Sequence, residues 1–250
     1  MTDEGPDATP SPGALFFVHV MKTGGSTFRQ RMVRQLGREA VFPCAPLDPP
    51  ELRPNADVRY LAGLSPQRLA GIRAFSGHFP FFATELVPPP SHVLSVLRDP
   101  VERAISFLKQ HHRDRGLGAE RSLESIYDLE WHRTFHITNY QVRVFATTSA
   151  DDIRSVMHYV DIDDDRLDVA KEHLRRVDIL GLHERYDEFV TEAVRRLGWS
   201  EDEVPSRRVS TPTDVPSSLR RRIAADNQRD LEFYEFAREL YEERRRERRR

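Results

Sequence analysis

A lysine, two glycines and two hydroxyl side chains follow one another near the N-terminus, in the stretch KTGGST at 22–27. An apolar run at 15–20 precedes this stretch, so the turn is predicted to join a buried strand to a helix over 26–36. The N-terminus of a helix binds anions through its unpaired N–H groups, and glycines let the backbone approach an oxyanion closely. Lys22 adds a full positive charge. The stretch therefore predicts an anion site, with an ordinary strand-to-helix turn as the alternative.

The order of residues in this stretch differs from that of the common nucleotide-binding loop. That loop has the pattern G-x-x-x-x-G-K-[ST], with its lysine after the glycines, whereas Lys22 precedes Gly24 and Gly25. No predicted strand ends in an aspartate that is convincingly placed to hold a magnesium ion. A kinase or another P-loop-like NTPase is therefore disfavoured and is kept only as an alternative.

A second candidate for anion binding follows the apolar run at 91–97. Arg98 stands just after this predicted strand, at its carboxyl end, where open parallel sheets bind ligands. Ser106 comes eight residues later, on a helix predicted to begin at Pro100. An arginine binds phosphate with two parallel hydrogen bonds, and a serine on a helix adds a hydroxyl. The alternative is that Arg98 pairs with Asp99 or a surface carboxylate and that Ser106 is an ordinary surface residue.

Strands and helices alternate along the chain in a pattern typical of a parallel sheet covered on both faces. A further short strand is predicted at 178–182, and the proline-rich segment 41–58 is predicted to be a loop. Helices are predicted over 26–36, 65–73, 134–146, 163–177 and 184–199, after Pro100 and Ser122, and from Pro216 onward. The predicted fold class is α/β, with three layers and a P-loop-like central parallel sheet flanked by helices.

The length of 250 residues fits one large domain or two small ones. Residues 1–13 are acidic and rich in proline and glycine, which predicts a disordered N-terminal arm. A single domain is predicted over 14–241. Residues 242–250 are predicted to be a charged tail of mostly solvated side chains, with docking on an acidic partner or an anionic lipid as the alternative.

Composition excludes several classes of protein. The net charge of −2 gives no global field that would recruit nucleic acid. One cysteine, Cys44, permits neither a disulfide framework nor a cysteine metal site within the chain. The N-terminal residues lack the pattern of a signal peptide, and no apolar run approaches the roughly 18 residues that a membrane helix needs. We expect a cytoplasmic protein with no transmembrane segment and no nucleic-acid partner.

The two anion motifs together resemble those of the sulfotransferase family that uses 3′-phosphoadenosine 5′-phosphosulfate (PAPS). VHVMKTGGST at 18–27 is similar to the family's 5′-phosphosulfate loop, and VLSVLRDPVERAISFL at 93–108 is similar to its 3′-phosphate motif. The likeness is strongest to carbohydrate O-sulfotransferases of the heparan sulfate 2-O and 6-O type and their bacterial relatives. Supporting stretches lie at 76–81, 138–146, 179–189 and 227–237, so the resemblance covers about residues 14–241.

The resemblance implies a role for each residue of the two motifs. The 5′-phosphosulfate would be held by Lys22, Thr23, Gly24, Gly25, Ser26 and Thr27. The 3′-phosphate would be held by Arg98 and Ser106. PAPS would be the co-substrate and 3′,5′-adenosine bisphosphate (PAP) the product, with no metal. Met21 stands where the family often has proline, which we expect to change the stiffness of the loop more than its chemistry.

Sulfuryl transfer to an alcohol needs a base for the hydroxyl proton and a cation near the oxygen that leaves sulfur. Lys22 suits the second role. His78, in FSGHFPFF at 75–82, is the best candidate among ten histidines for the first role, and the family's base lies in a similar stretch. The alternative is a structural loop histidine. Among the other histidines, His19 lies inside the first strand and is assigned to the core, and His111 and His112 end a helix, where a cation suits the helix dipole. His132 and His136 bracket a helix start and could reach the acceptor. Glu85 and Glu102 are the fallback bases.

The sequence does not identify the acceptor. Aromatic residues near His78 and the loop 41–58 allow a carbohydrate, a glycolipid or another small-molecule alcohol, and the oligomeric state is open. The loop 205–213 is a weak candidate to close over the cofactor, and Gln141 and Arg143 are weak candidates to line the site. A protein that binds a nucleotide without transferring a group is the remaining alternative, and the presence of both Lys22 and His78 argues against it.

Overall fold

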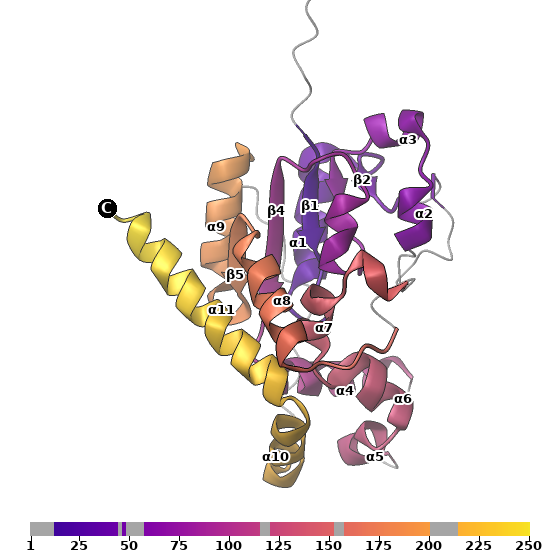
Figure 1. Cartoon of the computed structure of the whole chain (residues 1–250), viewed down its shortest axis with the longest axis vertical. Helices are drawn as coiled ribbons and strands as arrows, with labels where there is room; N and C mark the ends of the chain where they lie inside the picture. Colours follow the sequence, from indigo (N-terminus) through magenta and orange to yellow (C-terminus); the bar gives the residue numbers. More distant parts are fainter. Residues whose placement is uncertain (1–12, 45–46, 49–57, 116–120, 153–157, 201–214) are drawn as a thin grey trace, which may run out of the picture.

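Parallel strands form a central sheet in the order β2-β3-β1-β4-β5 (Figure 1). The computed structural model describes residues 13–44, 47–48, 58–115, 121–152, 158–200 and 215–250. The strands are β1 (Leu15–Val18), β2 (Val41–Phe42), β3 (Ala74–Phe75), β4 (His92–Leu97) and β5 (Ile179–Leu182). The sheet is flanked by helices on both faces, which confirms the predicted three-layer α/β fold.

The alternation of side chains along β1 explains why helices cover both faces of the sheet. Phe17 belongs to an apolar cluster with residues of α1 (Gly25–Leu36) and α9 (Tyr186–Leu197). Phe16 and Val18 point to the other face and belong to a cluster with residues of α7 (Tyr140–Ala146), α8 (Asp164–Arg175) and α11 (Gln228–Glu247). Figure 1 shows α8 and α11 in front of the sheet. Burial on both faces matches the continuous apolar runs in the sequence.

A third apolar cluster lies beyond the sheet. It is formed by α4 (Pro100–Asp114), α5 (Leu123–Tyr127) and α10 (Ser217–Asp226), which gather below the sheet in Figure 1 with α6 (Glu130–His132). Because α4 begins directly after β4, these helices are attached to the carboxyl end of the strands. The remaining elements are α2 (Val58–Ala62), α3 (Pro66–Ala70), η2 (Phe81–Glu85), η3 (Arg133–Ile137), η4 (Ser149–Asp151) and η5 (His183–Arg185).

Helix starts follow the capping residues that the sequence provides. The Ser65 hydroxyl accepts a hydrogen bond from the Arg68 N–H, the Ser122 hydroxyl accepts from the Ser125 N–H, and Asp99 accepts from the Glu102 N–H at 2.9 Å. Each cap satisfies an N–H group that has no partner within its helix. The helices predicted after Pro100 and Ser122 are confirmed, and the one predicted over 65–73 is confirmed at its start but ends at Ala70.

Two predicted helices are interrupted. The helix predicted over 134–146 consists of the π-helical η3 and then α7, separated at Asn139, which has a left-handed φ of 45°. The helix predicted from Pro216 breaks at Asn227 into α10 and α11. The two asparagines explain both breaks, because the Asn227 side chain accepts the Asn139 N–H at 2.9 Å. This contact joins residues 88 positions apart, which local pattern does not predict.

The predicted loops, arm and tail have different outcomes. Val41 and Phe42, within the predicted loop 41–58, form β2, because two residues suffice to extend the sheet at its edge. The charged tail continues α11 through Glu247. Residues 246–250 are exposed, in line with a tail of mostly solvated side chains, whereas Arg244 donates to the backbone oxygen of Val177 at 2.5 Å. The predicted arm, except for Gly13, and the loop 205–213 lie outside the described residues.

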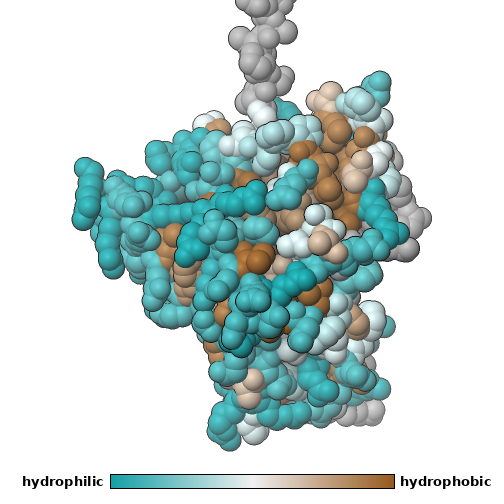
Figure 2. All heavy atoms as spheres, in the orientation of Figure 1, coloured by the Kyte–Doolittle hydropathy of each residue, from teal (hydrophilic) through white to brown (hydrophobic). Residues whose placement is uncertain are grey.

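The surface seen in Figure 2 is mostly hydrophilic, with apolar patches at its upper right, near α3. Among the described residues, no helix is long and apolar enough to cross a membrane.

Candidate functional site

Strand register brings the candidate residues together at one end of the sheet. Phe16 pairs with Phe75, so His19 and His78, each three residues further along, lie at the same level. Their ring centroids are 4.3 Å apart. Side chains that follow parallel strands gather at the carboxyl edge, where such sheets bind ligands. We call His19 and His78 the imidazole pair.

The turn between β1 and α1 has the backbone of an anion cradle. Lys22 and Gly24 have left-handed φ values of 69° and 93°. Gly25 and Ser26 are the first two residues of α1, and in the described part of the chain nothing accepts a hydrogen bond from their N–H groups. Orphan N–H groups at a helix N-terminus, near a lysine, favour a bound anion.

Side chains around the turn fix its shape. The Tyr186 hydroxyl donates to the Gly24 oxygen at 3.1 Å, and a Cβ at Gly24 would lie 2.8 Å from the Tyr186 ring, so only glycine fits. The Thr23 hydroxyl donates to the Val20 oxygen at 2.9 Å and is buried. Ser26 is exposed and Thr27 is half-buried. Thr23 thus stabilises the turn, whereas the other two hydroxyls lie nearer to solvent.

One hydrogen bond joins the two predicted anion motifs. The Arg98 guanidinium donates to the Lys22 backbone oxygen at 3.2 Å. The Lys22 ammonium donates to Oε1 of Gln110 at 2.7 Å. Gln110 lies one turn after Ser106 on α4, so these two side chains share a face of that helix. We call Lys22 and Arg98 the cation pair; the sequence analysis predicted both members but not Gln110.

The backbone of Arg98 is held by a buried network. The Gln141 side chain accepts the Arg98 N–H at 3.0 Å and donates to the Arg98 oxygen at 2.7 Å. Asp230 on α11 accepts the N–H groups of Gln141 and Val142 at 3.1 Å and 2.7 Å, which caps α7. Gln141 and Asp230 are both fully buried. Gln141, a candidate to line the site, therefore positions Arg98 through its backbone.

The geometry of His78 determines which ring nitrogen is basic. Its Nδ1 lies 2.8 Å from the backbone oxygen of His19. A carbonyl oxygen only accepts, so Nδ1 carries the proton and Nε2 keeps its lone pair. Burial lowers the pKa of His78, although the hydrogen bond to His19 opposes this shift. His78 is therefore neutral near pH 7, with one nitrogen ready to accept a proton.

His19 is buried, as its assignment to the core predicted, yet it borders the site. A Cβ on Gly25 would lie 2.1 Å from the His19 ring, so the imidazole packs directly against the start of α1. Burial, the neighbouring His78 and Arg29 hold the pKa of His19 well below its usual range. The imidazole pair is thus in contact with the anion cradle.

His183 is a site residue that the sequence analysis missed. It follows β5 directly, as Arg98 follows β4, and the pairing of Leu97 with Leu182 places the two side by side. Burial and the charges of Arg98 and Lys22 lower its pKa to about 4, while Glu184 opposes this shift. The available signal was its position immediately after the short apolar run at 178–182.

The other candidates are engaged elsewhere. Glu102 pairs with Arg220 at 2.6 Å and Glu85 with Arg176 at 3.4 Å, so both fallback bases lie in ion pairs. Arg143 is buried and donates to the backbone oxygens of η3. His111, His132 and His136 form a ring cluster with Phe107 on α4. Among the described residues, no group of three or more histidines, cysteines or carboxylates could hold a metal ion.

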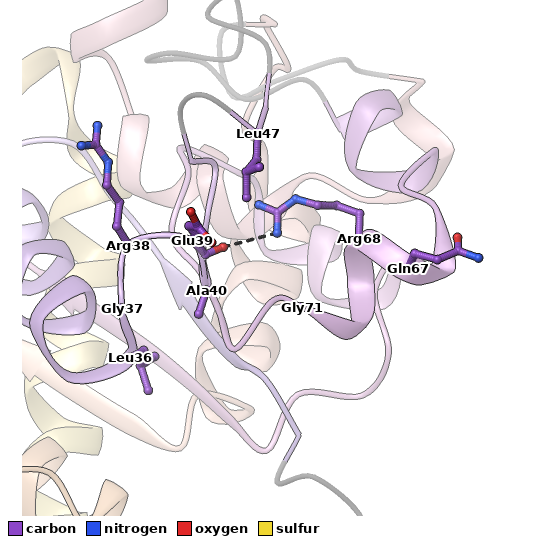
Figure 3. A pocket seen from close by; sticks show the side chains of 9 residues that line it. All are labelled: Leu36, Gly37, Arg38, Glu39, Ala40, Leu47, Gln67, Arg68 and Gly71. Atoms are coloured by element: carbon purple, nitrogen blue, oxygen red, sulfur yellow. Dashed lines mark hydrogen bonds between the residues drawn. The ribbon is translucent and has the colours of Figure 1, made fainter.

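A cavity of about 570 Å³ lies away from this site. Figure 3 shows its lining, in which Arg68 donates to the backbone oxygen of Glu39 at 3.4 Å. Gly37 and Ala40 precede β2 and Gly71 precedes β3, so the cavity lies at the amino end of the strands. It shares no residue with the candidate site.

No protein-family model and no curated protein matches the chain. Among solved structures, a sulfotransferase from Alicyclobacillus acidocaldarius is similar at a TM-score of 0.44 and 19% identity. That alignment covers 90% of this chain and 95% of that one.

Proposed function

We propose that the protein is a PAPS-dependent O-sulfotransferase. The observation that carries the proposal is the hydrogen bond between the Arg98 guanidinium and the Lys22 oxygen, since it unites two anion motifs at one edge of the sheet. Two separate phosphate sites side by side suit a ligand with a 5′-phosphosulfate and a 3′-phosphate. The family resemblance of both motifs adds to this support.

The unpaired N–H groups of Gly25 and Ser26, with the Lys22 ammonium, fit a 5′-phosphosulfate. Arg98 and Ser106 would bind the 3′-phosphate, and the Gln141 contacts would keep Arg98 in place. PAPS supplies the sulfuryl group when it is bound. No metal is assigned a role.

His78 would act as the general base. Its Nε2 accepts the proton of the acceptor hydroxyl while the hydroxyl oxygen forms a bond to sulfur and the bond from sulfur to the bridging phosphate oxygen breaks. Lys22 stabilises the negative charge on the oxygen released with PAP. The acceptor is a hydroxyl of a carbohydrate or of another small molecule, including a glycolipid. The resemblance favours a carbohydrate.

Purified protein, incubated with PAPS and a panel of hydroxyl compounds, tests the proposal by mass spectrometry of sulfated products. We expect transfer by the wild type and a loss of about 10²-fold or more in His78→Ala. His158→Ala, which changes an exposed histidine, is the matched control and should retain activity. Absence of transfer across the panel, or full activity of His78→Ala, would contradict the catalytic assignment.

Thermal shift separates this proposal from the alternatives. Stabilisation by PAP without magnesium is expected for a sulfotransferase. Stabilisation by ATP only in the presence of magnesium would favour a kinase-like NTPase. PAP binding without any transfer would leave a nucleotide-binding protein.

A further inference from the structure

His183 occupies a place in the site that neither anion motif includes. It is the first residue after β5, in register with Arg98 after β4, and it is half-buried. Lys22 and Arg98 are both close enough to act on its charge. We propose that His183 is a third ligand for the bound anion, and that it takes up a proton when the anion binds. The identity of that anion as a phosphate or sulfate group of PAPS rests on the proposed function.

Burial and two neighbouring cations keep His183 neutral. Arg98 from the end of β4 and Lys22 from the turn after β1 repel a positive charge on the ring, and burial disfavours that charge as well. Glu184 is the charged neighbour that favours a protonated His183. The Tyr234 hydroxyl from α11 donates to the Glu184 carboxylate at 2.5 Å, so this carboxylate already has a hydrogen-bond donor. The balance leaves two cations and one neutral imidazole around the site.

A bound anion reverses this balance. Its negative charge offsets those of Lys22 and Arg98 and attracts a proton to His183, which then donates a charge-assisted hydrogen bond. The pKa of His183 therefore rises on binding. Between the pKa values of the empty and the occupied site, binding takes up a proton, and anion affinity falls as pH rises, by at most tenfold per pH unit for one proton.

A structural histidine and a proton-linked ligand respond differently to substitution. A structural role predicts that substitution changes stability or affinity by the same factor at every pH. A proton-linked ligand predicts that substitution removes part of the pH dependence. The readout is therefore the slope of anion affinity against pH rather than a loss of function.

Calorimetric titration with PAP, and in parallel with inorganic pyrophosphate, tests the inference between pH 5.5 and 8.5. At one pH, two buffers of different ionisation enthalpy report the protons taken up. We expect proton uptake by the wild type and by the control His158→Asn, and smaller uptake with a flatter affinity profile in His183→Asn and His183→Gln. Melting temperatures of all variants verify that they are folded.

Equal slopes of affinity against pH, with equal proton uptake, in the wild type and both His183 variants would overturn the inference while leaving the proposed function intact. Binding of pyrophosphate but not PAP, with uptake that depends on His183, would support the inference and contradict the proposed co-substrate. Binding of neither anion by the wild type would overturn both.

Discussion

The imidazole pair and the cation pair lie at the same edge of the sheet, yet the first pair is neutral there and the second keeps its positive charge. Burial makes the charged form of His19 and His78 unfavourable, so both rings are neutral near pH 7. Lys22 and Arg98 are half-buried and hydrogen-bonded, and a guanidinium keeps its charge even when burial lowers its pKa. One edge thus offers a proton acceptor next to an anion cradle, because the two kinds of side chain differ in how easily they lose charge.

Removing charge from the cation pair should have the largest effect. Lys22→Ala is expected to lower the rate of sulfate transfer by about 10²–10³-fold, since it removes a cation from the oxygen that gains charge. Product formation at saturating PAPS measures the effect. The control is Lys109→Ala, which changes a lysine on α4 outside the anion motifs. A variant Lys22→Ala with more than a tenth of wild-type activity would contradict the assigned role.

Disturbing the boundary between the pairs should reduce stability. Gly25→Ala would place a methyl group 2.1 Å from the His19 ring, and we expect a cost of about 1–3 kcal/mol in the free energy of unfolding from the forced shift. Chemical denaturation measures it. The control Gly71→Ala has no neighbour closer than 3.6 Å. Equal stability of the two variants would show that the ring moves aside freely.

Weakening the support of Arg98 should have a smaller effect on catalysis than removing charge. Gln141→Ala leaves the Arg98 N–H and oxygen without their side-chain partner, at a cost of about 1–3 kcal/mol in stability. We expect a higher KM for PAPS with kcat less affected, because the side chain touches Arg98 rather than the reacting atoms. Steady-state kinetics separates the two constants, and an unchanged KM would refute this positioning role.

The smallest expected effect is a change in the pH dependence of stability, which the neutral imidazole pair should produce apart from any role of His78 in catalysis. The pKa of each histidine is lower in the folded protein than its ordinary value of about 6.5, so the unfolded chain binds more protons below that pH. Stability should therefore fall as pH falls below about 6.5. Melting temperatures from pH 7.5 to 5 should fall less steeply in His78→Gln than in the wild type and in His158→Gln. Identical profiles would indicate that folding does not lower the pKa of His78.

The sequence predicted the parts of the site that depend on local order. The strand ending before KTGGST and the strand ending at Arg98 both follow from apolar runs and the residues after them. The pairing of the strands decides which of these strand ends are neighbours. Because β1 pairs with β4, Lys22 and Arg98 come into contact. His183 was within reach of the same reasoning, since it also follows a predicted strand.

Contacts between distant segments were beyond the sequence pattern. Gln141 holds Arg98 across 43 positions, and Asp230 caps α7 across 89 positions. The breaks at Asn139 and Asn227 arise from the same docking of α11 on α7, because each asparagine uses its amide group on the other segment. Helical periodicity continues through both breaks, so only the three-dimensional contact reveals them.

The left-handed backbone of Lys22 sets stability against the retention of its ammonium group. A side chain in that region costs about 1–2 kcal/mol, which glycine would avoid. Selection for thermal tolerance alone would therefore favour Lys22→Gly, and it would discard the ammonium group at the same time. Directed evolution of this protein needs an activity screen at every round, since a gain in stability at Lys22 would remove the ammonium group that the proposed mechanism uses.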